Sequence, residues 1–382
     1  MITNDIYYIG VNDKTLDLFE GQYEIPNGIA YNSYVITDDK IAVMDTVDKR
    51  KTGEYLENLE QVLKGRTPDY LVISHLEPDH ASSIQAFLDR YPEVKLVSNA
   101  KAFQMLPQFL KKDPGETVVV KEGDTLALGH HTLTFVMAPM VHWPEVMMTY
   151  DKDAKVLFSA DAFGKFGSLD ADEPWDDEAR RYYFNIVGKY GAQVQAVLKK
   201  AAALDIDVIC PLHGPVLKET IGHVTELYKI WSSYEAESKG VLIAYASLHG
   251  NTAEGAEKLA QILKDKGCAD VALVDLARCD TSRVLENAFR YDRMVLAASS
   301  YNGGVVPCME DFLHHLKGKG FRKRTVGLVE NGAWAPSAAR TMKEILSQMN
   351  EVAVIEPAVT IRGVVKDSDI QAFEQMADSL MG

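Results

Sequence analysis

The segment SHLEPDH crowds two imidazoles and two carboxylates into six positions, directly after the apolar run DYLVI. His75, Glu77 and Asp79 alternate along what we expect to be an extended stretch, so their side chains can share one face. Pro78 fixes one backbone angle and stiffens the segment, and His80 then follows where the chain turns into a helix. Acids grouped near a hydrophobic core are costly without a cation. The pattern therefore predicts a metal site.

Three further candidate ligands each follow an apolar, strand-like run. His142 comes after FVMAPMV, Asp161 after KVLFSA, and His213 after IDVICPL. If these runs are strands of neighbouring sheets, their ends meet at one edge, and we expect all seven candidates to converge there. An isolated histidine is more often a hydrogen-bonded core residue than a ligand. That interpretation is given to His130, His131, His223, His314 and His315.

The elements that must position these residues come first as hairpins. Strand-like runs pair as SYVIT with KIAVMD, within TLALGHHTLTFV, and within VMMTYDKDAKVLFS, whose polar DKDA suits a turn. Helical patterns cover TGEYLENLEQVL and ASSIQAFLDRY, and a longer helix is expected from about residue 176 to 204. Antiparallel strands mixed with helices predict an α+β domain, layered as an αββα sandwich.

After Gly240 the chain alternates strictly between strands and helices. The strands read GVLIAYA, DVALVDL, RMVLAAS, RTVGLVE and VAVIEPAVTIRG, separated by helical segments such as TAEGAEKLAQILKDKG. Five such units predict an α/β doubly wound parallel sheet. The change of pattern lies within SSYEAESKG, so we expect one domain over residues 1–238 and a second over residues 239–382.

Three polar loops of the second domain follow strands one, three and four. Ligands of doubly wound sheets bind beyond the carboxyl ends of the strands, where all three loops must lie. The first loop opens a helix and offers hydroxyls, an amide and free backbone N–H groups, which together suit an anion. Alone, such a turn is more often only a helix cap. The candidate binding residues are Ser247, His249, Gly250, Asn251 and Thr252, then Ser300, Tyr301, Asn302, Gly303 and Gly304, then Asn331, Gly332, Ala333 and Trp334.

Composition narrows the classes of function. Of 382 residues, 40 are Lys or Arg and 55 are Asp or Glu, giving a net charge of −15. This charge repels nucleic acid and anionic membrane surfaces, and no window of 18 apolar residues predicts a spanning helix. No basic, apolar leader is visible, and the four scattered cysteines form no CxxC pair. We expect a cytoplasmic protein.

The ligand pattern resembles a known family. HxExDH followed by His142, Asp161 and His213 is similar to the metallo-β-lactamase fold, whose hydrolases usually carry histidine where this chain has Glu77. That acid, with VHWPE and SADAFG around the next ligands, resembles the flavodiiron proteins (A-type flavoproteins) over essentially the whole chain. The loop YASLHGNTAEG likewise resembles the FMN phosphate loop of flavodoxins. The resemblance implies a metallo-β-lactamase-like αββα domain followed by a flavodoxin-like domain.

It also implies a division of the ligands between two iron ions, with Asp161 bridging them. One iron would take His75, Glu77 and His142, and the other Asp79, His80 and His213, although family members differ in whether His80 coordinates. FMN would supply electrons singly for reduction of O2 to water, NO to N2O, or both. Tyr301 and Trp334 would flank the flavin ring, unless one of them merely packs against its own helix. Trp143, Phe163 and Tyr183 either line the open face of the metal site or simply pack in the core.

The resemblance further implies a head-to-tail homodimer, or a dimer of such dimers, in which each flavin lies beside the partner's irons. Because no CxxC…CxxC module is present, electrons would come from a separate donor such as rubredoxin. Two alternatives stay open. One is a two-zinc hydrolase with the FMN domain as a passenger, against which Glu77 argues because zinc favours neutral imidazole or thiolate. The other is a non-catalytic electron-transfer flavoprotein with a structural metal.

Overall fold

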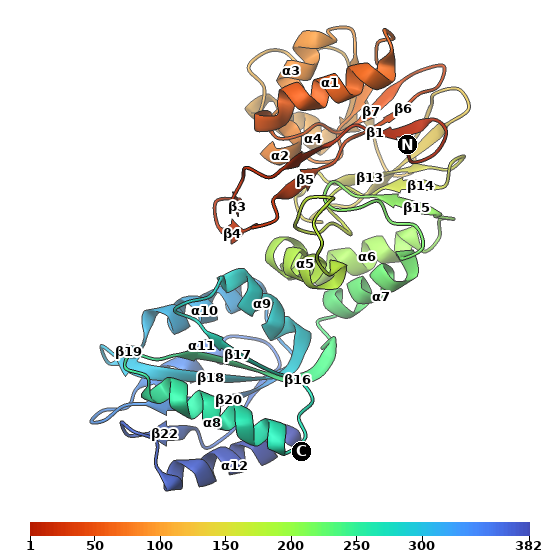
Figure 1. The fold of residues 1–382 in the computed structure, drawn as a ribbon. Coiled ribbons are helices and arrows are strands. Elements are labelled where there is room, and N and C mark those ends of the chain that lie inside the picture. The colour runs from red at the N-terminus through yellow and green to blue at the C-terminus, as the bar shows by residue number, and fades with distance from the viewer. The chain divides into compact units, whose positions relative to one another are not determined.

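The computed structural model describes residues 1–382, and the chain forms two compact units, Met1–Lys229 and Ile230–Gly382 (Figure 1). Each unit has its own sheets and core. None of the helices combines the length and the apolar character that crossing a bilayer requires.

The first unit is built on two sheets. The six-stranded sheet has the order β1 (Ile6–Tyr8), β6 (Tyr34–Ile36), β7 (Ala42–Met44), β8 (Tyr70–Val72), β9 (Lys95–Asn99), β10 (Thr117–Val120). The five-stranded sheet has the order β11 (Thr125–Ala127), β12 (Thr132–Met137), β13 (Met147–Asp151), β14 (Val156–Phe158), β15 (Val208–Cys210). The pairs β6–β7, β11–β12 and β13–β14 are antiparallel, which confirms the three predicted hairpins.

Helices cover the outer faces of these two sheets (Figure 1). One side carries α1 (Thr52–Leu63), α2 (Pro78–Ala81), α3 (Ile84–Arg90) and α4 (Ala100–Met105), and the other carries α5 (Trp175–Tyr182), α6 (Gly191–Ala201) and α7 (Ile221–Ser232). Buried side chains from both sheets, among them Tyr34, Val72, Phe135 and Phe158, form one core between them. This is the predicted αββα sandwich. Two short ribbons, β2 (Val11–Asp13) with β5 (Ile29–Tyr31) and β3 (Leu18–Phe19) with β4 (Tyr23–Glu24), complete the unit.

The single long helix expected from about residue 176 to 204 was wrong. After α5 the chain makes a π-helical turn over Tyr183–Val187 and a 3₁₀ turn over Gly188–Tyr190, and only then begins α6. Glycine is about 1 kcal/mol less favourable than alanine inside a helix, so Gly188 and Gly191 weaken the regular ladder at this point. Isolated π turns inside helices occur frequently at functional sites.

The second unit has a parallel sheet in the order β17 (Val271–Asp275), β16 (Ser238–Ala246), β18 (Tyr291–Tyr301), β20 (Arg324–Asn331), β21 (Val352–Val354). Helices cover both faces, with α8 (Asn251–Asp265) beside α12 (Asp367–Met381), and α10 (Pro307–Gly318) beside α9 (Thr281–Arg290) and α11 (Ala338–Leu346). The strand order is the flavodoxin-like version of the doubly wound fold, which confirms the predicted class.

The last predicted strand, over VAVIEPAVTIRG, is in fact two. β21 and β22 (Val359–Ile361) both pair with β20, but at different ends of it. Pro357 stands between them and has no N–H to donate to a sheet ladder, so one continuous strand cannot form here.

Candidate metal centre and flavin loops

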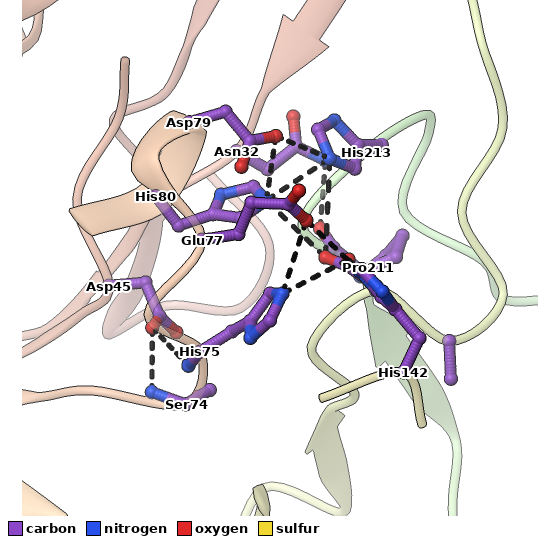
Figure 2. Close-up of polar contacts among 12 residues, drawn as sticks. Asn32, Asp45, Ser74, His75, Glu77, Asp79, His80, His142, Pro211 and His213 are labelled. Atoms are coloured by element: carbon purple, nitrogen blue, oxygen red, sulfur yellow. Dashed lines mark hydrogen bonds and ion pairs between the residues drawn. The ribbon is translucent and has the colours of Figure 1, made fainter. Parts of the chain in front are cut away.

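Seven side chains gather where strands of both sheets of the first unit end. His75 and Glu77 follow β8, His142 lies between β12 and β13, Asp161 follows β14, and His213 follows β15. Asp79 and His80 come from α2 and face the others (Figure 2). The structure thus brings together all seven residues that the sequence indicated as ligands.

The expected extended alternation fails after Glu77. Glu77 is the N-cap residue of α2, Pro78 occupies its first position, and Asp79 and His80 lie in the helical turn. Proline is favoured at the first helical position because its missing N–H has no partner there and its fixed φ suits the helix. The turn separates Glu77 from Asp79, so the two acids serve different groups of ligands.

The first group surrounds Glu77. His142 Nε2 lies 3.0 Å from Glu77 Oε2 and 3.0 Å from Asp161 Oδ2. His75 Nε2 lies 3.4 Å from Glu77 Oε2 and 3.6 Å from Asp161 Oδ2. These four ligand atoms lie within 4.8 Å of one another.

The second group surrounds Asp79. The Nε2 atoms of His80 and His213 lie 3.2 Å and 3.1 Å from Asp79 Oδ2, and 3.1 Å from each other. Asp161 Oδ1 lies 3.3 Å from His80 Nε2. Asp161 therefore presents Oδ2 to the first group and Oδ1 to the second, which is the arrangement of a bridging carboxylate.

The donor set fits two cations. Neighbouring ligands about a first-row metal with bonds of about 2.1 Å stand roughly 3 Å apart, which is the spacing found in both groups. Both oxygens of Asp79 and Oδ1 of Asp161 are buried and make no hydrogen bond. Buried carboxylate oxygens without partners are costly, and a metal ion removes that cost. All four histidines direct Nε2 inward.

Electrostatics support the same conclusion. Burial opposes ionisation of Asp161, yet the charge of His75 and a hydrogen bond from His142 hold the pKa of Asp161 well below its usual range. Burial likewise lowers the pKa of His142, but hydrogen bonds to Asp161 and Glu77 raise it to about 9. His80, beside Asp79, has a pKa raised to about 10 despite burial. Without metal, the carboxylates therefore hold protons on these histidines.

The outward-facing nitrogens of the histidines have unequal partners. His75 Nδ1 lies 2.8 Å from Glu145 Oε1, and His213 Nδ1 lies 2.8 Å from the carbonyl oxygen of Ala30. His80 Nδ1 is buried and has no hydrogen-bond partner. Such outer contacts fix which ring nitrogen carries the proton and how the ring is oriented. No pattern in the sequence indicated a role for Glu145, which lies in the segment VHWPE.

Two buried polar side chains hold the ligand loops. Asn32 Nδ2 donates to the carbonyl oxygens of Pro211 and Gly214, at 2.8 Å and 2.7 Å, and so brackets His213 (Figure 2). Asp45 Oδ1 accepts the N–H of Ser74 at 2.6 Å, directly before the first ligand. Neither residue was predicted from the sequence, because its role depends on contacts with distant segments.

Several non-glycine residues around the ligands adopt the left-handed backbone conformation. Asp45, Met140, Ala160 and Phe163 have φ values of 57°, 65°, 52° and 67°. Ala160 directly precedes Asp161. Such conformations cost of order 1 kcal/mol or more and persist where the surrounding structure enforces them, often at functional sites.

A cavity of about 270 Å³ opens against the centre. Glu77 and Asp79 line it from the ligand side, and Leu16, Phe19 and Tyr31 line it opposite. The volume is large enough for a small molecule, and the side chain of Glu77 is 15% exposed, whereas both carboxylate oxygens of Asp79 are buried.

The aromatic residues near the centre differ in what they contact. The ring of Trp143 lies perpendicular to that of His75, at 5.2 Å. Phe163 packs against Tyr228, and Tyr183 packs against Tyr228 and Phe184. Tyr182, which was not predicted from the sequence, has its ring 5.4 Å from that of His213. Adjacent tyrosines in one helix give no sequence signal for which of them faces a ligand.

In the second unit the first polar loop ends at the N-terminus of α8. Gly250 has φ of 92° and is the N-cap residue, and its N–H donates to Ser247 Oγ at 3.0 Å. Thr252 is buried with its hydroxyl 2.9 Å from that of Ser299, which ties the first loop to the second. His249, Gly250 and Leu248 are exposed. The free backbone N–H groups here suit a phosphate.

The second and third loops flank this site at the carboxyl edge of the sheet. Asn302 and Gly303 form a tight hairpin between β18 and β19 (Gly304–Val305), both with positive φ. Ser300 Oγ accepts the N–H of Ser337, and the amide of Asn331 bonds reciprocally to the backbone of Gly363. These side chains therefore shape the loops, whose backbone stays available for a ligand.

Exposed rings and a required glycine complete the edge. Trp334 and Tyr301 are 91% and 44% exposed, beside Gly332 and Ala333 of the third loop. A Cβ at Gly332 would lie 2.7 Å from Pro336 Cα, so only glycine fits. Two exposed aromatic side chains near a helix N-terminus that suits a phosphate are compatible with a planar, phosphate-bearing ligand such as FMN.

Comparison with known proteins agrees with this structure. A family model described as ODP family beta lactamase matches residues 29–214, and a flavodoxin domain model matches residues 242–365. The nitric oxide reductase of Moorella thermoacetica is 30% identical over 381 residues, covering 97% of this chain and 95% of that protein.

Solved structures match over the full length as well. Rubredoxin oxygen:oxidoreductase from Desulfovibrio gigas is 27% identical with a TM-score of 0.93, covering 100% of this chain and 97% of that one. The flavodiiron protein of Giardia intestinalis has the same fold, with a TM-score of 0.93 at 24% identity, and covers 100% and 95% of the two chains.

Proposed function

Because this chain belongs to the flavodiiron protein family, we propose that it reduces O2 to water, NO to N2O, or both, at a diiron centre supplied with electrons by FMN. The chain is an oxidoreductase, and its cofactors are FMN and two non-haem iron ions. The observation that carries the proposal is the sharing of Asp161 between two complete ligand groups.

The donor set favours iron over zinc. Zinc sites prefer neutral imidazole or thiolate ligands in tetrahedral geometry. Here four histidines are joined by three carboxylates, a harder and more anionic set. Two ferrous ions carry four positive charges against three negative ones, so the buried centre stays close to neutral.

The ligand assignment that we propose follows the two groups. His75, Glu77 and His142 hold one iron, Asp79, His80 and His213 hold the other, and Asp161 bridges them. When bound, the irons supply open coordination positions for the gas and the electrons for its reduction. The chain's own residues orient the ligands, and the cavity beside Glu77 and Asp79 admits the substrate.

The flavin assignment is likewise a proposal. The phosphate would lie at the backbone N–H groups of residues 247–252, with His249 at the rim of that loop. The ring would lie between Tyr301 and Trp334, against the backbones of residues 300–304 and 331–334. The exposure of both aromatic side chains supports this arrangement.

Electron stoichiometry explains why one chain needs both cofactors. Reduction of O2 to two waters takes four electrons and four protons, while two NO molecules yield N2O and water with two of each. FMN and the diiron centre each store two electrons. We propose a separate rubredoxin-type donor, supported by the name of the D. gigas relative.

The quaternary arrangement that we propose is a head-to-tail homodimer, alone or paired into a dimer of dimers. The apolar surface that Trp334 and Tyr301 expose at the flavin edge supports it, because a partner would cover that surface. The diiron domain would comprise residues 1–238 and the FMN domain residues 239–382. Four free cysteines support a reducing, cytoplasmic location.

The deciding experiment measures O2 and NO consumption separately, after anaerobic reduction of one preparation containing both cofactors. We expect turnover with at least one gas, with N2O as the product from NO. If neither gas is consumed by protein with two irons and one FMN per chain, the proposed function fails.

A further inference from the structure

The partner behind each ligand histidine is also part of the metal centre. A carboxylate that accepts a hydrogen bond from a metal-bound imidazole makes that imidazole a stronger donor, and a carbonyl does so less. Here His75 is backed by the carboxylate of Glu145, at 2.8 Å, whereas His213 is backed by the neutral carbonyl of Ala30, at the same distance. His80, in the second group with His213, has no outer partner at all.

Glu145 is placed to keep its charge. It is 1% exposed, and its Oε1 accepts hydrogen bonds from both His75 Nδ1 and the N–H of Leu76, the latter at 2.9 Å. Oε2 is buried and makes no hydrogen bond, so the two donors to Oε1 are the contacts that stabilise the carboxylate form.

Glu145 is also held rigidly. Its backbone carbonyl accepts a hydrogen bond from Asn99 Nδ2 at 2.6 Å, and Asn99 itself caps α4. Together with the two hydrogen bonds to Oε1, this contact holds the carboxylate against Nδ1 of His75 and so places its charge behind that imidazole.

We propose that Glu145 makes the two metal positions electronically unequal, so that the half-oxidised centre holds its ferric ion at the position of His75, Glu77 and His142. This inference rests on the proposed diiron function and deepens it. The additional electron density behind His75 stabilises a ferric ion at the first position. The second position lacks a comparable hydrogen bond, because His213 is backed by a neutral carbonyl and His80 Nδ1 has no partner. In the step concerned, the diferrous centre gives one electron to added ferricyanide, which becomes ferrocyanide, and no atom is transferred.

The role assigned to Glu145 is that of a positioning and charge-donating residue. When electrons enter the diferric centre one at a time, the second position is reduced first. The position beside His75 is then the last to become ferrous.

The test is Mössbauer spectroscopy of ⁵⁷Fe-loaded wild type and Glu145→Gln in the diferric and mixed-valent states. Glutamine keeps the acceptor oxygen for His75 but removes the charge. We expect an iron affinity about 10- to 100-fold lower, and a changed isomer shift for the ferric doublet of the mixed-valent state alone. Because the variant perturbs the position beside His75, the perturbed doublet identifies that position.

A matched control is Asp151→Asn, which removes the charge from a second buried carboxylate–imidazole pair, with His131 at 2.6 Å. This pair contacts no metal ligand, so its loss affects stability but leaves both doublets unchanged. Should Glu145→Gln fail to retain two irons, Glu145→Asp serves instead, since the shorter chain weakens the same bond.

The outcomes separate this inference from the proposed function. Wild-type protein that holds no iron pair contradicts the function itself. The inference is contradicted if the iron pair is intact but Glu145→Gln perturbs only the ferrous doublet, perturbs both doublets equally, or perturbs neither of them. In each of these cases the proposed function still stands.

Discussion

The ring nitrogens Nε2 of His80 and His213 lie 3.1 Å apart and face the same space (Figure 2). Two neutral imidazoles cannot direct lone pairs at each other at this distance without a shared proton or a cation between them. The carboxylate of Asp79, 3.1 Å from His213, increases the demand for positive charge.

Metal uptake should therefore release protons. Neighbouring carboxylates, opposing the effect of burial, raise the pKa of His142 to about 9 and that of His80 to about 10, so both rings are protonated in metal-free protein at neutral pH. Iron requires neutral imidazoles. Anaerobic titration with ferrous ion in dilute buffer and indicator dye should show proton release, and the apparent affinity should rise with pH up to about 9 to 10. An affinity independent of pH over that range would contradict this account.

Glu77→His should impair the reductase more than the fold. The change replaces a charged ligand by a neutral one and shifts the first group toward the composition that zinc prefers. We expect iron content to fall, zinc content to rise and turnover to drop about 10-fold or more, with the melting temperature little changed. Metal analysis and gas consumption check this, with Glu54→His on the exposed face of α1 as the control. Full iron content and turnover in the variant would refute the prediction.

Tyr182→Phe should lower turnover and leave the irons in place. The buried hydroxyl of Tyr182 makes no hydrogen bond, and burial followed by the charges of Asp161 and Asp79 raises its pKa well above the usual value, so it stays a donor. The ring of Tyr182 lies 5.4 Å from that of His213, so we expect the hydroxyl to donate to a molecule bound at the second ligand group, and loss of one such donor typically costs about 10²- to 10³-fold in rate. Tyr183→Phe is the comparison, and an equal loss in both variants would count against a specific role for Tyr182.

Hybrid dimers should recover activity if the dimer is head-to-tail. His213→Ala removes a metal ligand, while Asn251→Asp places a negative charge where the FMN phosphate would bind and still suits a helix N-terminus. Each variant alone should be inactive. After subunit exchange, about a quarter of the wild-type rate should return, because half of the dimers are hybrids with one competent pair. If the mixture stays inactive although exchange is demonstrated, the arrangement is wrong.

The pair of His131 and Asp151 should make stability depend on pH. The hydrogen bond to Asp151 raises the pKa of His131, which is 7% exposed. In the unfolded chain the pKa of this histidine is about 6.5. Because folding raises that pKa, the stabilisation is fully present below about pH 6.5 and is lost as the pH rises through the pKa of His131 in the folded protein. Relative to His131→Gln, the wild type should gain roughly 1–2 kcal/mol at low pH and lose this advantage at high pH. Urea unfolding across pH checks it, with the exposed neighbour variant His130→Gln expected to show no such trend.

The fold was largely predictable because its signals are local. Alternating apolar runs and polar turns predicted the hairpins and the parallel sheet, and the strand ends predicted where ligands would meet. The failures have physical causes as well. Gly188 and Gly191 interrupt an apparent helix, Pro357 divides an apparent strand, and Pro78 begins a helix where an extended segment was expected.

The site was predictable only as far as its metal-facing atoms. A histidine or acid after a strand is visible in the sequence, but the residue that holds it comes from elsewhere. Asn32 lies 179 residues from Pro211, and Glu145 lies 70 residues from His75. Such partners are ordinary polar residues whose importance arises only from tertiary contact.

The left-handed backbone at Asp45, Met140, Ala160 and Phe163 also limits how this protein can vary. Side chains branched at Cβ are disfavoured in that conformation, whereas glycine and asparagine adopt it readily. In a scan of all substitutions at Ala160, valine and isoleucine should be depleted more strongly than glycine or asparagine, against the usual order of hydrophobic exchange. The metal centre thus constrains positions that do not themselves bind metal. At these positions, backbone geometry decides which side chains are tolerated.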